Sequence, residues 1–316
     1  MKRLDRILAV LDPTTDEQPG LAKAARLARE FGATLELFVC DFDPALTGKP
    51  FFDTDSLRHL RDKFVNERRK WMDQMAQELR EDGIAIETHV HWDNPLYRGI
   101  LRRIEESSPD LVVKDTHDHS AIRRVMLTNT DWHLIRTSPV ALLLTRAREW
   151  AASPRLLAAL DPGHHGDKPA QLDHDILAYA ALIAGRLGGE MHAVHAFFPA
   201  ALLAATTGMA GLPTTTGVSA VDILDSERER VTLELKQLTA SQDLPEAHVH
   251  LVQGSPVEVL PRIASELAAD VLVMGAVSRS RLQEIFIGST AERVVDRVES
   301  DLLIIKPGDF VAPAGA

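Results

Sequence analysis

The feature that most constrains the fold of this chain is an internal repeat. The segment Arg6–Pro13 (RILAVLDP) matches Arg155–Pro162 (RLLAALDP) in the character of every residue. Further along each half, Asp110–Lys114 (DLVVK) matches Asp270–Met274 (DVLVM). Similarity at a long fixed period is typical of duplicated structural units. The chain is therefore expected to consist of two copies of one domain in tandem.

Apolar and helical stretches alternate in each half, and this alternation predicts an α/β fold with five strands and four helices. In the second half the predicted strands lie near Leu156–Leu160, Met191–Ala196, Ala247–Val252, Val271–Met274 and Leu302–Ile305. Runs such as Leu111–Val113 are continuously apolar, as expected of parallel strands covered by helices on both faces. We expect domains at residues 1–147 and 153–308, joined by a short linker.

The composition argues against several classes of protein. The 316 residues carry a net charge of -11, which disfavours a nucleic-acid partner. The apolar stretch Ile7–Leu11 is too short for a signal peptide, and Phe197–Leu212 is too interrupted for a membrane helix. The single cysteine, Cys40, lies in an apolar run and is expected to pack as a small hydrophobic residue. We therefore expect a cytoplasmic protein that does not bind membranes.

The second half contains a loop with the residue types of a phosphate site. Its fourth predicted strand ends at Gly275, and the loop that follows carries Ser278. Gly288, Ser289 and Thr290 then precede a helical stretch. Glycine lets backbone amides approach phosphate oxygens, and a helix N-terminus supplies unpaired N–H groups and partial positive charge. The pattern predicts an anion site at the carboxyl edge of the sheet, where parallel sheets bind their ligands.

This segment resembles the nucleotide-binding signature of the universal stress protein family, G-x-x-G-x(9)-G-(S/T). Gly275, Gly288 and Ser289 match their places, whereas Ser278 stands where the family has its second glycine. Asp161, which closes the first strand of this half, matches the family acid that meets the adenosine moiety. The resemblance spans both halves and is similar in form to the tandem, E-type members.

The resemblance implies a fold and a function for each half. It implies two flavodoxin-like or Rossmann-like domains, each a five-stranded parallel sheet in the order 3-2-1-4-5 with helices on both faces. It also implies a cytoplasmic stress-response protein that regulates or binds, supporting resistance to DNA-damaging or other stress, without enzymatic activity. ATP is expected in the second domain only, and the residues that would bind it are Asp161, Gly275, Ser278, Gly288, Ser289 and Thr290.

Two alternatives remain open for the second-half loop. Ser289 and Glu292 have the spacing of a capping box, which satisfies helix N–H groups without a ligand. The hydroxyl of Ser278 either replaces a phosphate contact or obstructs one.

The first half has lost the glycines of this loop. The equivalent positions are Asp115, Asp118, Thr128 and Asn129, so two carboxylates would repel a triphosphate there. Lys114 closes the fourth strand, next to the strand that ends at Asp12. We expect either a Lys114–Asp12 pair that fills the unused site or a lysine turned into solvent.

Other function classes find little support in the sequence. The histidine-containing segments near His89 and His91, Asp173 and His174, and His192 and His195 have no recognised metal-ligand spacing, so no metal site is predicted. Neither a Gly-x-Ser-x-Gly elbow nor a Walker loop is present, and an adenylating enzyme would lack any recognisable catalytic motif. The remaining alternative is a nucleotide-free scaffold or a carrier of a small apolar ligand beneath Phe197–Leu212. Association with further copies of the chain is a further expectation.

Overall fold

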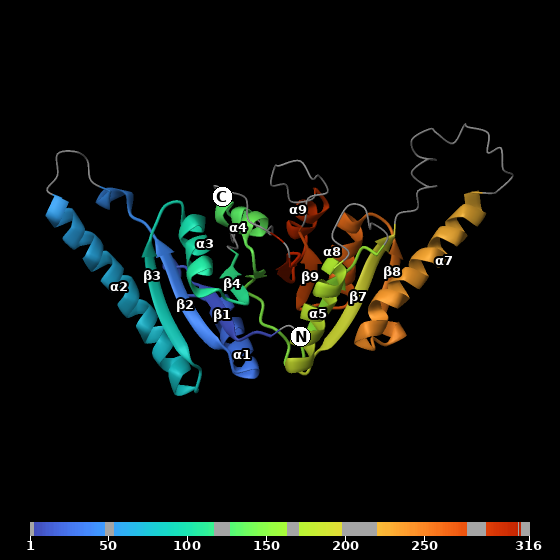
Figure 1. Cartoon of the computed structure of the whole chain (residues 1–316), viewed down its shortest axis with the longest axis horizontal. Coiled ribbons are helices and arrows are strands. Elements are labelled where there is room, and N and C mark those ends of the chain that lie inside the picture. The colour runs from blue at the N-terminus through green and yellow to red at the C-terminus, as the bar shows by residue number, and fades with distance from the viewer. Residues whose placement is uncertain are drawn as a thin grey trace. The chain divides into compact units, whose positions relative to one another are not determined.

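The structure is a computed structural model, and it describes residues 3–47, 54–116, 127–162, 171–197, 220–276, 289–308 and 310 (Figure 1). The chain divides into two compact units. The first holds the described residues up to Trp150 together with Asp301–Ile304 and Phe310, and the second holds those of Ala151–Ser300 with Ile305 to Gly308. Among the described residues, no helix is both long enough and apolar enough to span a membrane.

The first unit follows the predicted alternation of strands and helices. Its elements are β1 (Arg6–Val10), α1 (Pro19–Phe31), β2 (Thr34–Asp41), η1 (Pro44–Leu46), α2 (Thr54–Glu81), β3 (Ile86–Trp92), α3 (Leu96–Ser107), β4 (Leu111–Asp115), α4 (Asn129–Thr137) and β5 (Ala141–Thr145). Parallel pairing of β3 with β2, β2 with β1, β1 with β4 and β4 with β5 gives the order 3-2-1-4-5. The predicted topology of this half is therefore confirmed.

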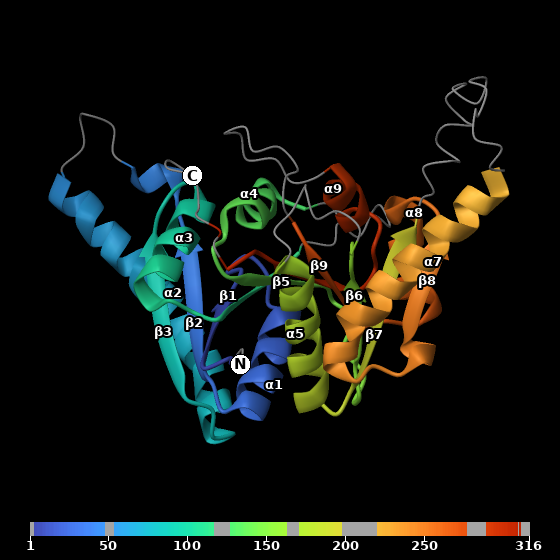
Figure 2. The same ribbon diagram turned by 45° about the vertical axis from the view of Figure 1, so that its right-hand side comes forward.

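The two faces of this sheet are covered by different helices (Figures 1 and 2). Thr88 of β3 donates to Asp73 of α2 at 3.1 Å, and the Gly20 amide of α1 donates to Asp115 at 2.7 Å. Strand residues whose side chains point to the opposite face, such as Glu36 of β2, instead face α3, from which Arg103 donates to Glu36. Successive strand residues point to opposite faces, so α1 and α2 lie on one face and α3 and α4 on the other. The central strands are buried on both sides, which explains their continuous apolar runs.

The second unit repeats this arrangement. Its elements are β6 (Arg155–Ala159), α5 (Gln171–Arg186), β7 (Glu190–Phe197), α7 (Ala220–Thr239), η3 (Ala240–Gln242), η4 (Glu246–His248), β8 (Val249–Gln253), α8 (Pro256–Glu266), β9 (Val271–Gly275) and α9 (Ser289–Val295). Parallel pairing joins β8 to β7, β7 to β6 and β6 to β9, which is the first unit's order for its first four strands.

The last strand, β10 (Asp301–Ile305), adds a pairing that the sequence analysis did not predict. It pairs antiparallel with β5, with Leu303 opposite Leu143. The fully buried Asp301 at its start accepts hydrogen bonds from Lys23 at 2.7 Å, from the Arg146 amide at 2.8 Å and from Trp150 at 2.7 Å. These donors hold the first residue of β10 beside the end of β5.

Candidate functional site

The carboxyl end of β4 in the first unit is occupied by a buried ion pair. The Lys114 Nζ lies 2.8 Å from the Oδ1 of Asp131, the third residue of α4. The Asp131 side chain is fully buried, and that of Lys114 is 11% exposed. Lys114 also donates to the Asp115 carbonyl at 2.9 Å. A lysine and a carboxylate thus neutralise one another at the carboxyl edge of the sheet, where parallel sheets bind their ligands.

The same carboxylate closes the N-terminus of α4. The amide and the hydroxyl of Thr128 each donate to Asp131 Oδ2 at 2.8 Å, and the Asp131 amide donates back to the Thr128 hydroxyl at 3.2 Å. This is a capping box, in which the helix satisfies its own first N–H groups. An external anion would have to displace these internal bonds.

A second carboxylate, Asp115, occupies the start of α1. It accepts a hydrogen bond from the Gly20 amide at 2.7 Å and one from the Thr145 hydroxyl at 2.5 Å. Burial raises the pKa of Asp115, and these two hydrogen bonds oppose the rise. A Cβ atom on Gly20 would lie only 2.7 Å from the Asp115 oxygen, so the glycine makes room for the carboxylate.

One predicted pairing in the first unit is wrong. We expected Lys114 to pair with Asp12 or to turn into solvent, but its carboxylate partner is Asp131. The Asp12 carboxylate instead accepts bonds from the amide and the hydroxyl of Thr14, at 2.8 and 2.6 Å. Asp131 was missed because α4 carries it over β4 from a distant part of the sequence. Asp118 lies outside the described residues, and Asn129 is the first residue of α4.

Each group that fills the first site is replaced at the matching position of the second unit. Met274 stands for Lys114 at the end of the strand, and Ala291 stands for Asp131 in the helix. Both are buried, with exposed fractions of 5%. Gly275 stands for Asp115, and Gly288 for Thr128. The second unit therefore lacks the charged and hydroxyl groups with which the first unit fills its own site.

The structure accounts for Gly275 by packing. A Cβ atom there would lie 2.6 Å from Cδ2 of Leu172 in α5. Its absent side chain is thus explained without a ligand, and a backbone contact to phosphate remains a prediction.

The other predicted binding residues are described only in part. Asp161 follows β6, the neighbour of β9, so it lies at the same edge of the sheet as Gly275. Its amide donates to Asp173 at 3.3 Å, and its carboxylate lies 4.0 Å from Nδ1 of His195. Ser278 and Gly288 lie outside the described residues. Ser289 and Thr290 open α9, but their side chains also fall outside the described part, so the Ser289–Glu292 capping box stays a prediction.

A model of one family matches both halves of the chain, at residues 3–146 and 166–306, and that family is the universal stress protein family. The chain belongs to the universal stress protein family. The two matched segments correspond to the two copies predicted from the repeat.

Individual universal stress proteins match along the whole length. The chain is 28% identical to universal stress protein E of Salmonella typhi, with 99% of this chain and 98% of the relative covered. It is 27% identical to universal stress protein E of Escherichia coli K12, with 99% and 97% covered. Among solved structures, a functionally unknown protein from Pseudomonas aeruginosa is 26% identical, with a TM-score of 0.74 over 98% of this chain and 94% of that chain. A universal stress protein from Archaeoglobus fulgidus, 17% identical with a TM-score of 0.64 over 96% and 98% of the two chains, shares the fold.

A basic residue that the sequence reading missed lies at the universal stress motif of the second unit. Lys306 follows β10, and its Nζ donates to the carbonyl of Ala276, the residue after Gly275, at 2.6 Å. Burial lowers its pKa to about 8. Its position at the end of an apolar strand was a usable signal, because strand ends at this edge carry the ligand-binding groups.

Two further features of the described residues bear on ligands. No group of three or more His, Cys, Asp or Glu side chains in the described ranges is arranged to hold a metal ion, and the expectation of no metal stays a prediction.

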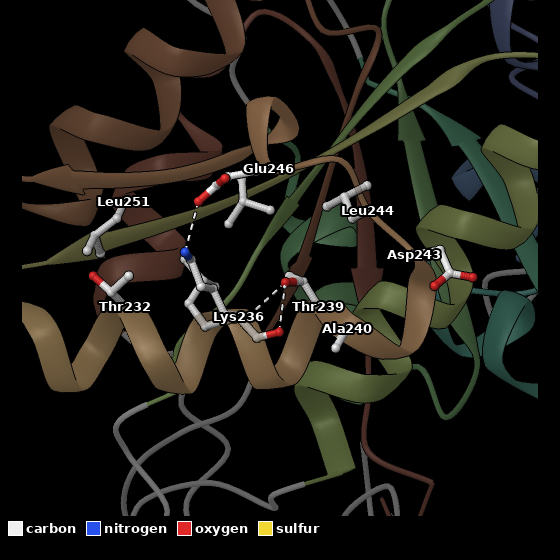
Figure 3. Close-up of a pocket in the computed structure, with 10 residues that line it drawn as sticks. Thr232, Lys236, Thr239, Ala240, Asp243, Leu244, Glu246 and Leu251 are labelled. Carbon is white, nitrogen blue, oxygen red and sulfur yellow. Dashed lines mark hydrogen bonds and ion pairs between the residues drawn. The ribbon is translucent and has the colours of Figure 1, made fainter.

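A cavity of about 630 Å³ lies between α7 and the start of β8 (Figure 3). Leu235, Leu244, Val249 and Leu251 line it, and a Lys236–Glu246 ion pair of 2.8 Å spans it. The cavity is at the amino end of β8, away from Asp161 and Gly275.

Proposed function

We propose that this universal stress protein is a cytoplasmic stress-response module that binds an adenine nucleotide, ATP foremost, in its second unit only. The observation that carries the proposal is the paired replacement of Lys114 and Asp131 by Met274 and Ala291. The ion pair occupies the end of the fourth strand in the first unit, and the second unit has no ion pair at these two positions. Binding and regulation, rather than turnover, are the proposed activity.

The residues of the second unit have distinct roles in this proposal. Asp161 would face the adenosine, and Gly275 with the loop at Ser278 would lie along the phosphates. Gly288 and Ser289, with Thr290, would bind the terminal phosphates through backbone amides and hydroxyls. Lys306, next to Ala276, would add positive charge at the same edge.

The test transfers the ion pair of the first unit into the second. The nucleotide content of the purified chain is measured after denaturation, and ATP is then titrated calorimetrically into the wild type and into the Met274→Lys, Ala291→Asp double variant. The proposal predicts binding in the wild type and its loss in the double variant, because an internal carboxylate repels and replaces the phosphate. Lys114→Met, Asp131→Ala is the matched control and is expected to bind ATP like the wild type.

Either of two results would contradict the proposal. One is the absence of both bound nucleotide and binding heat in the wild type. The other is unchanged binding in a folded Met274→Lys, Ala291→Asp variant, which would place any nucleotide elsewhere. Circular dichroism establishes that the variant is folded.

Carriage of a small apolar ligand is a second candidate, and the cavity between α7 and β8 favours it. Its volume of about 630 Å³ is within the range of small-molecule sites, and its lining combines leucines with one ion pair. The segment Phe197–Leu212, on which this alternative first rested, lies outside the described residues. Fluorescence of an apolar dye should rise on binding the wild type and fall for Leu251→Lys. An equal signal from both would exclude this cavity as the site.

A further inference from the structure

Three histidines form a cluster on the second unit, independent of the nucleotide site. His192 lies on β7, His248 ends η4, and His250 lies on β8. The Nδ1 of His192 is 3.1 Å from the Nε2 of His250. The rings of His192 and His248 are stacked with centroids 4.1 Å apart, and the Nδ1 of His248 is 3.0 Å from the carbonyl of Met191. The cluster thus connects the edge strand and η4 to β7.

The contact between His192 and His250 limits how many protons the cluster can hold. A hydrogen bond between two imidazole nitrogens needs an N–H on one ring and a lone pair on the other, so at least one ring is neutral. If both rings are protonated, two N–H groups face each other and two positive charges lie side by side. His248 already uses its Nδ1 as a donor to a carbonyl, since a carbonyl only accepts.

The charged neighbours do not compensate for a second proton. Glu190 of β7 has an oxygen 3.8 Å from Nε2 of His192, but Arg155 of β6 shares that carboxylate at 3.2 Å. Burial, followed by the neighbouring His248 and His250, lowers the pKa of His192 to about 4. Burial and then His248 lower the pKa of His250. The closed arrangement therefore resists protonation.

The first unit has permanent charges at the equivalent place on its sheet. Glu36 of β2 lies opposite Glu87 of β3, and its side chain is fully buried. Arg103 donates to Glu36, while Arg6 lies 3.5 Å from Glu36 and 2.7 Å from Glu87. Carboxylates paired with arginines keep their charges throughout the range near neutrality. At the positions that match Glu36 and Glu87 the second unit has His192 and His248. His89 of the first unit, which matches His250, lies 3.8 Å from the Glu87 carboxylate. The second unit thus has three histidines in contact where the first has one histidine among fixed charges.

We propose that the second unit is an acid sensor, in which protonation of the His192, His248 and His250 cluster releases the edge strand β8 from β7. β8 is the last strand in the sheet order. With β8 apart from β7, His192 and His250 regain their ordinary affinity for protons, so acid favours the released state. A proton that binds only the released state shifts the equilibrium between paired and released β8. The shift is about tenfold for each pH unit between the pKa of the histidine in the released state and its pKa in the paired state.

The sign follows from the direction of the pKa shifts. A histidine whose pKa is lowered in the folded state stabilises that state fully above about pH 6.5, its ordinary pKa. That contribution is lost progressively as the pH falls from 6.5 toward the lowered value of about 4 for His192. The response therefore lies on the mildly acidic side of neutrality.

Hydrogen–deuterium exchange on the full chain tests the proposal. Exchange of the peptide covering η4 and β8 is measured at pH 7 and pH 5 and corrected for the intrinsic effect of pH. Its protection is expected to fall by roughly tenfold or more at pH 5, and that of the peptide covering β1, which has no histidine, is expected to change far less. Equal changes in the two peptides would overturn the proposal.

The variant His250→Gln provides the matched test. A glutamine amide can still bond to the Nδ1 of His192 but does not titrate, so protection at pH 7 should be kept and the acid response should shrink. His174→Asn, at an exposed position on α5, is the control and should respond like the wild type. An unchanged acid response in His250→Gln would contradict the proposal. If that variant does not fold, NMR titration of labelled histidines in the wild type decides, since ordinary pKa values for His192 and His250 would equally overturn it.

Discussion

At the residue scale, the two units differ in how they treat the end of their fourth strand. The buried carboxylate of Asp131 is tolerable because Lys114 and Thr128 surround it with a charge and with donors. A buried ion without its partner is strongly destabilising, whereas an apolar pair of similar fit is not. Replacing both residues of the ion pair together, as Met274 and Ala291 do in the second unit, therefore leaves no buried charge unpaired and is compatible with a stable fold.

Lys114→Met is expected to destabilise the first unit by about 3 kcal/mol, because it leaves the Asp131 carboxylate buried and unpaired. Lys114→Met with Asp131→Ala, which copies the second unit, should recover most of that loss. All four tryptophans, at positions 71, 92, 132 and 150, belong to the first unit, so urea unfolding followed by tryptophan fluorescence reports on this unit. If Lys114→Met were as stable as the wild type, the Lys114–Asp131 pair would make no contribution to the stability of the first unit.

Gly275→Ala is expected to destabilise the second unit by about 1–3 kcal/mol through overpacking against Leu172. Adding Leu172→Val should restore part of the stability, because it removes the methyl groups that clash. Thermal unfolding followed by circular dichroism measures both variants. A Gly275→Ala variant as stable as the wild type would indicate that Leu172 simply rotates away.

The sequence predicted part of this site and not its partners. Lys114 was predicted near a strand end and lies there, but its expected pairing with Asp12 is wrong, because its partner is Asp131. Its partner could not be predicted, because the contact depends on how α4 lies over β4. The opposite case is Gly275, where a sequence motif suggested a ligand contact and the structure shows a packing reason.

At the scale of elements, the repeat and the apolar runs predicted the strands well. The strands expected near Met191–Ala196 and Val271–Met274 are β7 and β9, with ends shifted by at most one residue. The antiparallel partner of β10 was not predictable, because periodicity shows that a strand is buried but not which strand it joins. The side chain of Asp301 supplies the missing information, since its partners lie at the end of β5 and just after it.

Asp301→Ala is expected to destabilise the first unit by about 3–5 kcal/mol, since Lys23 and Trp150 lose a buried acceptor. Trp150→Phe removes one of those donors and should cost less, about 1 kcal/mol. The fluorescence-detected urea midpoints of the two variants check this order. A larger loss for Trp150→Phe would contradict the central place given to Asp301.

At the scale of the whole molecule, duplication has produced two units that share a topology and differ in chemistry. The first unit uses fixed charges both at the end of β4 and between β2 and β3. The second unit has apolar residues at the first of these places and histidines at the second. One universal stress fold thus occurs twice in the same chain, once with a buried ion pair at the end of its fourth strand and once with apolar residues there.

The central claim is that only the second unit binds nucleotide, and the stoichiometry of ATP binding tests it most directly. Calorimetric titration of the full chain should give one ATP per chain in the wild type, one in Lys114→Met, Asp131→Ala, and none in Met274→Lys, Ala291→Asp. Two ATP molecules per wild-type chain, or one that persists when the second site is filled by its own ion pair, would contradict this account.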